Sequence, residues 1–264
     1  MESWFAMCAA AAILCSSVAA QQEAGSTLTF EVASIRPAKE NVQGVRGGCH
    51  GIDSVFTPGQ TEIPPLGRCV IRDGRLSHMV GIAWNIDMTM LKSGPDWIQR
   101  GFDRFNLEAK AEDPAKTTEK QLLQMLQALL IERFQMKFHR EPVEMSGFAL
   151  TVAKGGSKLV PSKNQDQEGS FGPQGKPSQN AGMFKAKRYS MAELARLLGL
   201  FGGRGPGVDR TGLTGLYDFT LTWDNEAGPT LETALREQLG LQMKSEKVAT
   251  SYFVIDSAMR PSEN

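Results

Sequence analysis

Apolar side chains occupy every second position from Tyr217 to Trp223, and each is followed by a polar residue. A period of two places the apolar side chains on one face, so residues 217–224 are predicted to form a half-buried strand. The preceding stretch, residues 211–215, reads Thr-Gly-Leu-Thr-Gly. Glycine and threonine are common in chain reversals, and we expect this stretch to be a turn rather than a binding loop.

Helical periodicity is clearest in "TEKQLLQMLQALLIERF", where apolar residues recur every three or four positions. Thr118 and Gln121 make a capping box at its start, which predicts a helix from that point. A shorter helix is predicted to begin at Thr230 and to stop at Gly240. The stretches "HMVGIAW" and "SMAELARLLGLF" predict two further helices, and alternation in "LTFEVASIRPA" predicts a strand that Pro37 ends.

The chain matches itself at a constant offset of 105 residues, which pairs Glu132 with Glu237 and Val143 with Val248. Similar predicted elements precede and follow both stretches, in the order strand, helix, short strand, strand, helix, strand, strand. A period of this length indicates duplication and not a solenoid. The expected fold is therefore α+β, with two similar halves that are each a small antiparallel sheet carrying helices packed on one face.

Five segments follow from this pattern. The first is a signal peptide (1–20), followed by an N-terminal strand with an irregular, disulfide-stapled loop (21–73). A first α+β half (74–155), a flexible linker (156–181) and a second α+β half (182–264) complete the chain. The linker is rich in Gly, Ser, Pro, Gln and Lys, a composition that packs poorly.

Residues 4–20 carry no charge, and the apolar stretch is too short for a membrane span. Small residues precede Gln21, so we expect cleavage after Ala20 and a secreted or periplasmic protein, although residues 1–3 contain no Lys or Arg. Removal of Glu2 leaves the 29 basic residues against 28 acidic ones. Near-neutral charge gives no indication of a nucleic-acid partner, and the mature chain is expected to have no membrane span.

Two cysteines, Cys49 and Cys69, remain after cleavage. In an exported chain an even pair favours a disulfide, which would stabilise the protein by roughly 3 kcal/mol. Zinc binding by Cys49, His50, Cys69 and His78 is the alternative, although their spacing matches no compact zinc motif. No cofactor is expected.

The sequence predicts no catalytic residues, since it has neither a G-x-S-x-G nor an H-E-x-x-H motif. The glycine-rich residues 202–207 follow a predicted helix and are interpreted as a connection. His139 is expected to be exposed on a strand, and His78 to lie in the first turn of a helix. Four aromatic residues that could stack on sugars are expected in the core instead: Trp84, Trp97, Phe105 and Trp223.

Seven motifs lie in order along the chain: "FEVASIRPAKE", "GPDW", "LLQMLQALLIERFQMKFHRE", "ALTVAKGGSKL", "VDRTGLTGLYDFTLTW", "ALREQLGLQMKSEK" and "VIDSAMRPSEN". Together they resemble a large family of exported domain-of-unknown-function proteins that is expanded in soil Acidobacteria (Solibacter-type). The resemblance implies no activity or catalytic residue. Similar domains attached to membrane-embedded, sensor-type metallopeptidases suggest extracytoplasmic sensing or interaction. A non-enzymatic protein that binds an envelope protein or a small ligand is favoured, and a secreted hydrolase acting on an extracellular polymer through acidic residues is the alternative.

Overall fold

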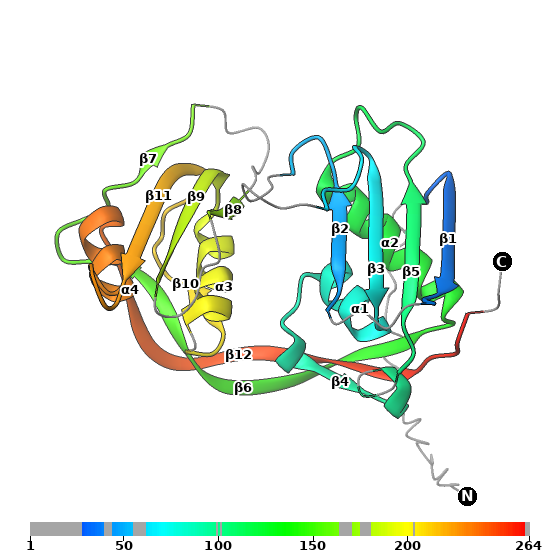
Figure 1. The fold of residues 1–264 in the computed structure, drawn as a ribbon. Helices are drawn as coiled ribbons and strands as arrows, with labels where there is room; N and C mark the ends of the chain where they lie inside the picture. The colour runs from blue at the N-terminus through cyan, green and yellow to red at the C-terminus, as the bar shows by residue number, and fades with distance from the viewer. Residues whose placement is uncertain are drawn as a thin grey trace, which may run out of the picture.

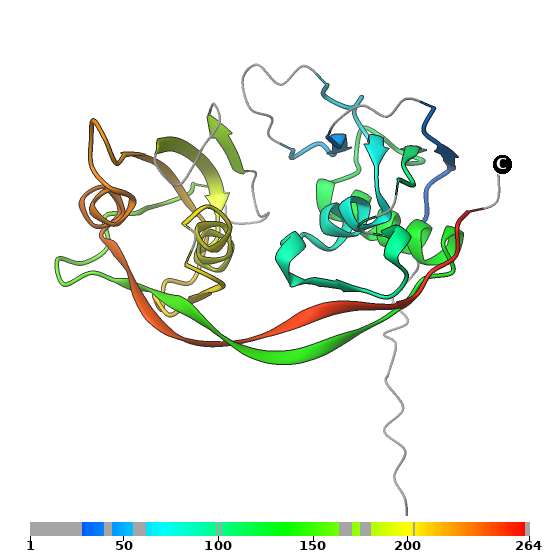
Figure 2. The ribbon, with the colours of Figure 1, turned by 60° about the horizontal axis from the view of Figure 1, so that its bottom comes forward.

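A computed structural model of the chain describes residues 28–39, 44–54, 62–98, 100, 102–163, 171–174, 181–202 and 204–261. The expected signal peptide, residues 1–20, lies outside the described residues. The chain forms two lobes joined by one long two-stranded ribbon, and both lobes stand on the same side of the ribbon (Figure 1). Figure 2 shows the ribbon from a second direction, as a curved band beneath the two lobes.

The first lobe contains a four-stranded antiparallel sheet in the order β1-β5-β3-β2. Its strands are β1 (Val32–Pro37), β2 (Arg46–His50), β3 (Arg68–Gly74) and β5 (Phe105–Lys110). Two helices, α1 (Leu76–Trp84) and α2 (Glu119–Arg133), cover one face of this sheet. The opposite face of the sheet carries mostly polar side chains and is called the open face below.

The second lobe contains another antiparallel sheet, in the order β7-β11-β9-β8. Its strands are β7 (Val160–Pro161), β8 (Phe171–Gln174), β9 (Ala181–Tyr189) and β11 (Tyr217–Asp224). The helix α3 (Met191–Gly202) packs on it together with α4 (Leu231–Ala234), which continues as the π-helical turn η3 (Leu235–Leu239).

The ribbon consists of β6 (Lys137–Val152) and β12 (Leu241–Ser257), which pair antiparallel along almost their whole length. Two short strands extend it, one at each end: β10 (Gly207–Asp209) lies parallel to β6, and β4 (Leu91–Ser93) lies parallel to β12. Two 3₁₀ turns, η1 (Met88–Met90) and η2 (Asp96–Ile98), flank β4.

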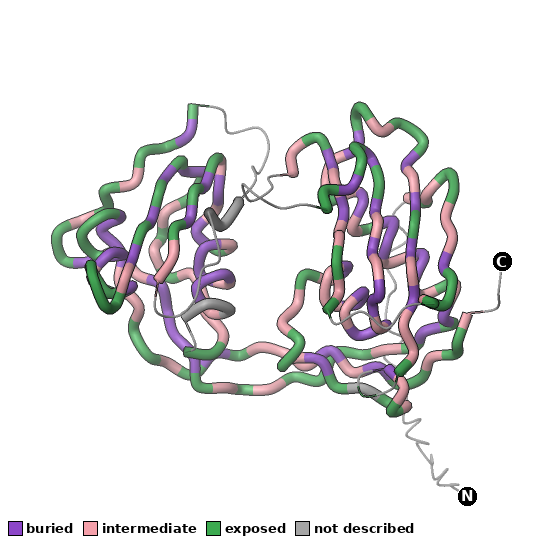
Figure 3. The backbone as a smooth tube through the Cα atoms, viewed as in Figure 1, coloured by how far each residue is buried: buried purple, intermediate pink, exposed green. Residues whose placement is uncertain are grey.

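Each lobe has its own apolar core, and the ribbon contributes to both. In the first lobe, the α1 residue Trp84 packs against Phe138 and Phe253 of the ribbon, with ring centroids 5.3 and 5.0 Å apart. The helix α1 therefore lies between the sheet and the ribbon. Between the lobes, residues 143–146 of β6 are exposed or half-buried, and Figure 3 shows the buried segments divided between the two lobes.

The predicted local features agree closely with the structure, and the mixed α+β content is confirmed. Buried and exposed side chains alternate along β11, and the hydroxyl of Thr118 accepts a hydrogen bond from the Gln121 amide at the start of α2. Thr230 caps α4, and Gly240 ends η3 with a φ of 69°, a left-handed conformation that glycine adopts easily. Residues 211–215 form the connection between β10 and β11, as expected of a turn.

Two expectations were wrong. Residues 38–73 were expected to be irregular, yet they contain β2 and β3, because pairing with β5 compensates for the low strand propensity of the local sequence. The two strands expected after each long helix are one continuous strand, β6 or β12. Pro142 does not interrupt β6 because β10 pairs only further along, so β6 has a single neighbouring strand at this point.

Each half was expected to contain one antiparallel sheet of its own. The ribbon instead forms a third sheet that both halves share, and this sheet is mixed because it contains two parallel pairs. Within residues 156–181, which were expected to be a linker, the structure places β7 and β8 at the two edges of the second sheet.

Candidate functional site

The most distinctive feature of the first lobe is the loop between β2 and β3, residues 51–67, called the stapled loop here. Cys49 and Cys69 lie directly opposite each other at its base and form the predicted disulfide, with their Cα atoms 4.0 Å apart. In the second sheet the strands β8 and β9 are likewise an edge strand and its neighbour, but residues 175–180 alone connect them. The stapled loop is therefore longer than the corresponding connection in the second lobe.

The first arm of the stapled loop is fastened to the N-terminus of α2. Asp53 Oδ1 accepts a hydrogen bond from the Glu119 amide at 2.7 Å, and the Ser54 hydroxyl donates to Glu119 Oε2 at 3.0 Å. Burial raises the pKa of Glu119; the nearby charge of Asp53 raises it further, and the Ser54 hydrogen bond opposes the shift. A Cβ atom on Gly51 would lie 2.0 Å from the Glu119 amide nitrogen, so only glycine fits this approach.

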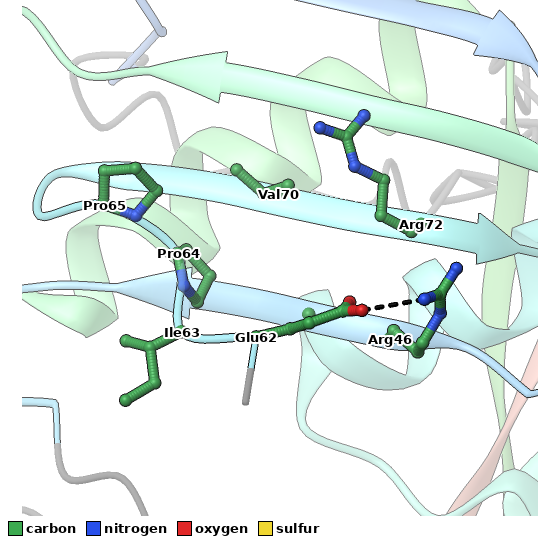
Figure 4. Close-up of a pocket in the computed structure, with 8 residues that line it drawn as sticks. Arg46, Glu62, Ile63, Pro64, Pro65, Val70 and Arg72 are labelled. Atoms are coloured by element: carbon green, nitrogen blue, oxygen red, sulfur yellow. Dashed lines mark hydrogen bonds and ion pairs between the residues drawn. The ribbon is translucent and has the colours of Figure 1, made fainter. Parts of the chain in front are cut away.

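The second arm, residues 62–66, passes over the open face of β2 and β3 and leaves a pocket of about 340 Å³ beneath it. His50 Nδ1 donates to the Pro64 carbonyl at 2.6 Å, and the Gly67 amide donates to the His50 carbonyl at 2.7 Å, which holds this arm in place. Figure 4 shows the loop residues facing the two strands. This loop pocket is lined by Arg46, Gly47, Glu62, Ile63, Pro64, Pro65, Val70 and Arg72.

Two arginines of the loop pocket stand directly opposite each other, Arg46 on β2 and Arg72 on β3. Like charges at such positions repel. Each guanidinium is balanced by an acid from another segment: Arg46 Nη1 lies 2.7 Å from Glu62 Oε1 of the stapled loop, and Arg72 pairs with Glu108 of β5. All four side chains are partly exposed to solvent, so these ion pairs contribute little to stability.

The residues of the zinc alternative are not brought together. Cys49 and Cys69 are joined in the disulfide, and His50 follows Cys49 at the end of β2, opposite Arg68. His78 lies beyond the other end of β3, about 20 Å away for a strand of this length. It accepts a hydrogen bond from the Arg75 amide at 3.3 Å in the first turn of α1, as expected. Burial, with a contribution from Arg75 and Arg104, lowers the pKa of His78.

The other candidate residues take the structural roles expected of them. His139 is exposed on β6, where its Nδ1 lies 2.8 Å from Asp256 Oδ1. Phe105 and Trp223 are buried in the two cores, and Trp84 and Trp97 pack against the first core. The glycine-rich residues follow α3, and Arg204 within them pairs with Glu232.

Sequence analysis missed the arginines of the loop pocket, because residues 38–73 were treated as irregular. The apolar run Cys69-Val70-Ile71 between two arginines could have revealed β3, because β-branched residues favour strands. The strand that faces it, β2, could not be found in this way, because "RGGCH" contains two glycines and no alternation.

Residues 77–258, well over half of the chain, match the family model described as "Protein of unknown function (DUF3738)". The chain belongs to this family. No curated protein and no solved structure matches the chain. The region shared with the DUF3738 family begins in α1, so the loop pocket lies N-terminal to it. In the part of the chain that the structure describes, no helix is long and apolar enough to cross a membrane.

Proposed function

We propose that this DUF3738 protein is an exported, non-enzymatic protein of the cell envelope that binds a small ligand or the exposed end of a protein partner in the loop pocket. The observation that carries the proposal is the pocket itself, a hollow of about 340 Å³ between the stapled loop and the open face. Its volume is within the range of small-molecule sites, and it combines apolar walls with a few charged groups.

The way the stapled loop is held supports this proposal. One arm is bonded to α2, the other to His50, and the disulfide closes the base. A loop fixed at three places loses little conformational freedom when a ligand binds, so more of the contact energy appears as affinity.

Export is part of the proposal and has a direct test. The chain is expressed with residues 1–264 in a bacterial host, and the mass of the protein outside the cytoplasm is measured before and after reduction and thiol alkylation. We expect a chain that begins at Gln21 and takes up the alkylating reagent only after reduction. Two thiols that react without reduction would argue against export and against an oxidised Cys49–Cys69 pair.

Binding is tested on the same oxidised protein with a mixed library of charged and neutral fragments, followed by amide chemical shifts. We expect some fragments to shift residues of the loop pocket selectively, above all Val70 and Arg72. Shifts that occur only elsewhere, or none at all, would exclude the pocket as the binding site.

The alternative function, hydrolysis of an extracellular polymer by acidic residues, would require carboxylates that converge on open space. Asp53 and Glu119 lie close together and the pKa of Glu119 is raised, which are features of acid–base sites. Both side chains are already engaged, however, in attaching the stapled loop to α2. The arrangement therefore favours a structural role for this pair and a binding role for the loop pocket.

We further propose that the two lobes arose by duplication. The element order from β1 to β6 recurs from β7 to β12, and the sheet orders β1-β5-β3-β2 and β7-β11-β9-β8 correspond strand by strand. The offset of 105 residues also aligns Phe148 with Phe253, which pair with the short strands β10 and β4 respectively. Comparison of the two halves in other family members should find apolar residues at both positions; unrelated residues there would contradict the proposal.

A further inference from the structure

The chemistry of the loop pocket indicates what it binds. We propose that it takes a carboxylate carried on a small apolar body, and that this carboxylate replaces Glu62 as the partner of Arg46, opposite Arg72. The inference rests on the proposed binding function and adds the class of ligand and the means of recognition. A peptide C-terminus and a free carboxylic acid share this chemistry.

The charge of the pocket favours an anion. Arg46 and Arg72 project from directly opposite positions of neighbouring strands, where two cations repel each other. A guanidinium presents its donors in a planar fork that matches the two oxygens of a carboxylate. Glu108 already faces Arg72 from β5, so the place that a ligand can take is the one held by Glu62.

The existing ion pair can be exchanged at little cost. The side chains of Arg46 and Glu62 are 44% and 43% exposed, so water already solvates both groups and screens their attraction. A ligand carboxylate that binds Arg46 makes an equivalent contact while Glu62 turns into solvent. The gain in affinity then comes from the second arginine and from the apolar contacts of the rest of the ligand.

The remaining walls limit the ligand to a small apolar group. Val70 of β3 and Ile63, Pro64 and Pro65 of the stapled loop supply the apolar part of the lining. The two prolines have no amide hydrogen to donate, so they offer contact but no N–H hydrogen bonds. Gly48 lies opposite Val70 on β2 and has no side chain. A Cβ atom on Gly48 would meet nothing within 4 Å, so space is available beside Val70 on the open face.

The test uses the mature, oxidised protein and three probes: the tripeptide Ala-Ala-Leu, the same tripeptide as its C-terminal amide, and 4-methylpentanoate. Binding is followed by calorimetry and by the amide shifts of β2 and β3. We expect the free-acid tripeptide to bind at least tenfold more tightly than its amide. If 4-methylpentanoate matches the tripeptide, the ligand is a free acid; if it is at least tenfold weaker, the ligand is a peptide C-terminus. Equal binding of acid and amide would overturn the inference.

Five variants sharpen this result. Arg46→Gln and Arg72→Gln should each weaken binding of the free acid at least tenfold. Arg68→Gln, on the open face of β3 but outside the pocket lining, is the matched control and should change the affinity less than twofold. Glu62→Gln removes the internal competitor and should strengthen binding by up to about fivefold, as expected for an exposed ion pair.

The fifth variant, Gly48→Thr, adds a side chain beside Val70 where space is available, so it should fold normally and block the pocket. Weaker binding in Glu62→Gln, or equal effects of Arg46→Gln and Arg68→Gln, would contradict the proposed exchange. Selective binding of neutral fragments without any preference for the acid would overturn this inference and leave the proposed function standing. Absence of any pocket ligand would overturn both.

Discussion

Phe148 and Phe253 occupy equivalent places on the two strands of the ribbon but are buried in different lobes. Phe148 of β6 lies opposite Gly207 of β10 in the second core, and Phe253 of β12 lies opposite Leu91 of β4 in the first core. Each strand therefore leaves one lobe and completes the core of the other. Among the described residues, the ribbon has no further strand on either side between the lobes, and most of its residues there are exposed or half-buried, so these insertions hold its ends in place.

Truncation of either phenylalanine should destabilise mainly the lobe in which its side chain is buried. Phe253→Ala and Phe148→Ala should each lower the free energy of unfolding by about 3–5 kcal/mol, the usual loss for a fully buried phenylalanine. Hydrogen exchange localises the effect: amides of β5 should lose protection in Phe253→Ala, and amides of β11 in Phe148→Ala. Val254→Ala, on the other side of β12, is the control and should change stability by about 1 kcal/mol or less. Equal loss in both lobes would indicate a single cooperative unit.

Removal of the disulfide should destabilise the first lobe selectively. The bond joins residues 20 apart in the sequence, and replacement of both cysteines by alanine should cost roughly 3 kcal/mol through the added freedom of the unfolded chain. Denaturant unfolding with and without reductant measures the loss. A reductant should lower the stability of the natural protein and leave the double-alanine variant unchanged. Loss of protection in the second lobe would contradict the separation of the two cores.

The Glu119→Gln variant should change how stability depends on pH. Burial raises the pKa of Glu119, so its contribution to stability is complete at low pH and is lost as the pH rises through the raised pKa. Glutamine removes the ionisable group and still accepts the hydrogen bond from Ser54. The variant should therefore gain stability relative to the natural protein on going from about pH 4 towards neutrality. Measured unfolding free energies over this range decide the point; a less stable variant at pH 7 would show that attraction to the α2 N-terminus outweighs burial.

Local features of the fold could be predicted from the sequence because neighbouring residues determine them. The alternation along β11, the capping box of Thr118 and the left-handed Gly240 each depend on a few consecutive positions. The continuity of β6 and β12 could not be predicted, because Pro142 and Gly147 resemble strand ends unless the pairing with β12 is known. The parallel additions of β4 and β10 also join residues that are far apart in the chain.

The loop pocket shows the same limit for function. Its disulfide follows from counting cysteines, but the opposition of Arg46 and Arg72 depends on the register of β2 on β3. Gly47 shows why this register is hard to predict. It has a φ of 92°, and a Cβ atom there would lie 2.0 Å from the Val70 carbonyl oxygen. A glycine that suggests a loop in the sequence is instead what allows β2 to approach β3.

The Asp218→Asn variant should loosen one edge of the second sheet in a pH-dependent way. Asp218 accepts hydrogen bonds from the Ser162 hydroxyl at 2.5 Å and from the Arg188 amide at 2.7 Å, which ties the end of β7 and an irregular turn of β9 to β11. The Ser162 hydrogen bond, followed by that of Arg188, lowers the pKa of Asp218. The contribution of Asp218 to folding stability is therefore present at pH values above the ordinary pKa of aspartate, and it is lost as the pH falls through the lowered pKa.

At neutral pH the substitution should lower the free energy of unfolding by about 1 kcal/mol, since solvent weakens hydrogen bonds at this exposed position. The difference in unfolding free energy between Asp218→Asn and the natural protein should become smaller in acid. The Ser162 amide donates to the Leu216 carbonyl, and its hydrogen exchange should be faster in the variant. Asp224→Asn is the matched control, because Asp224 accepts hydrogen bonds from the nearby turn amides of residues 226 and 227 and ties no second strand to β11 among the described residues. Equal acceleration at Ser162 in both variants would show that Asp218 does not hold β7 in place.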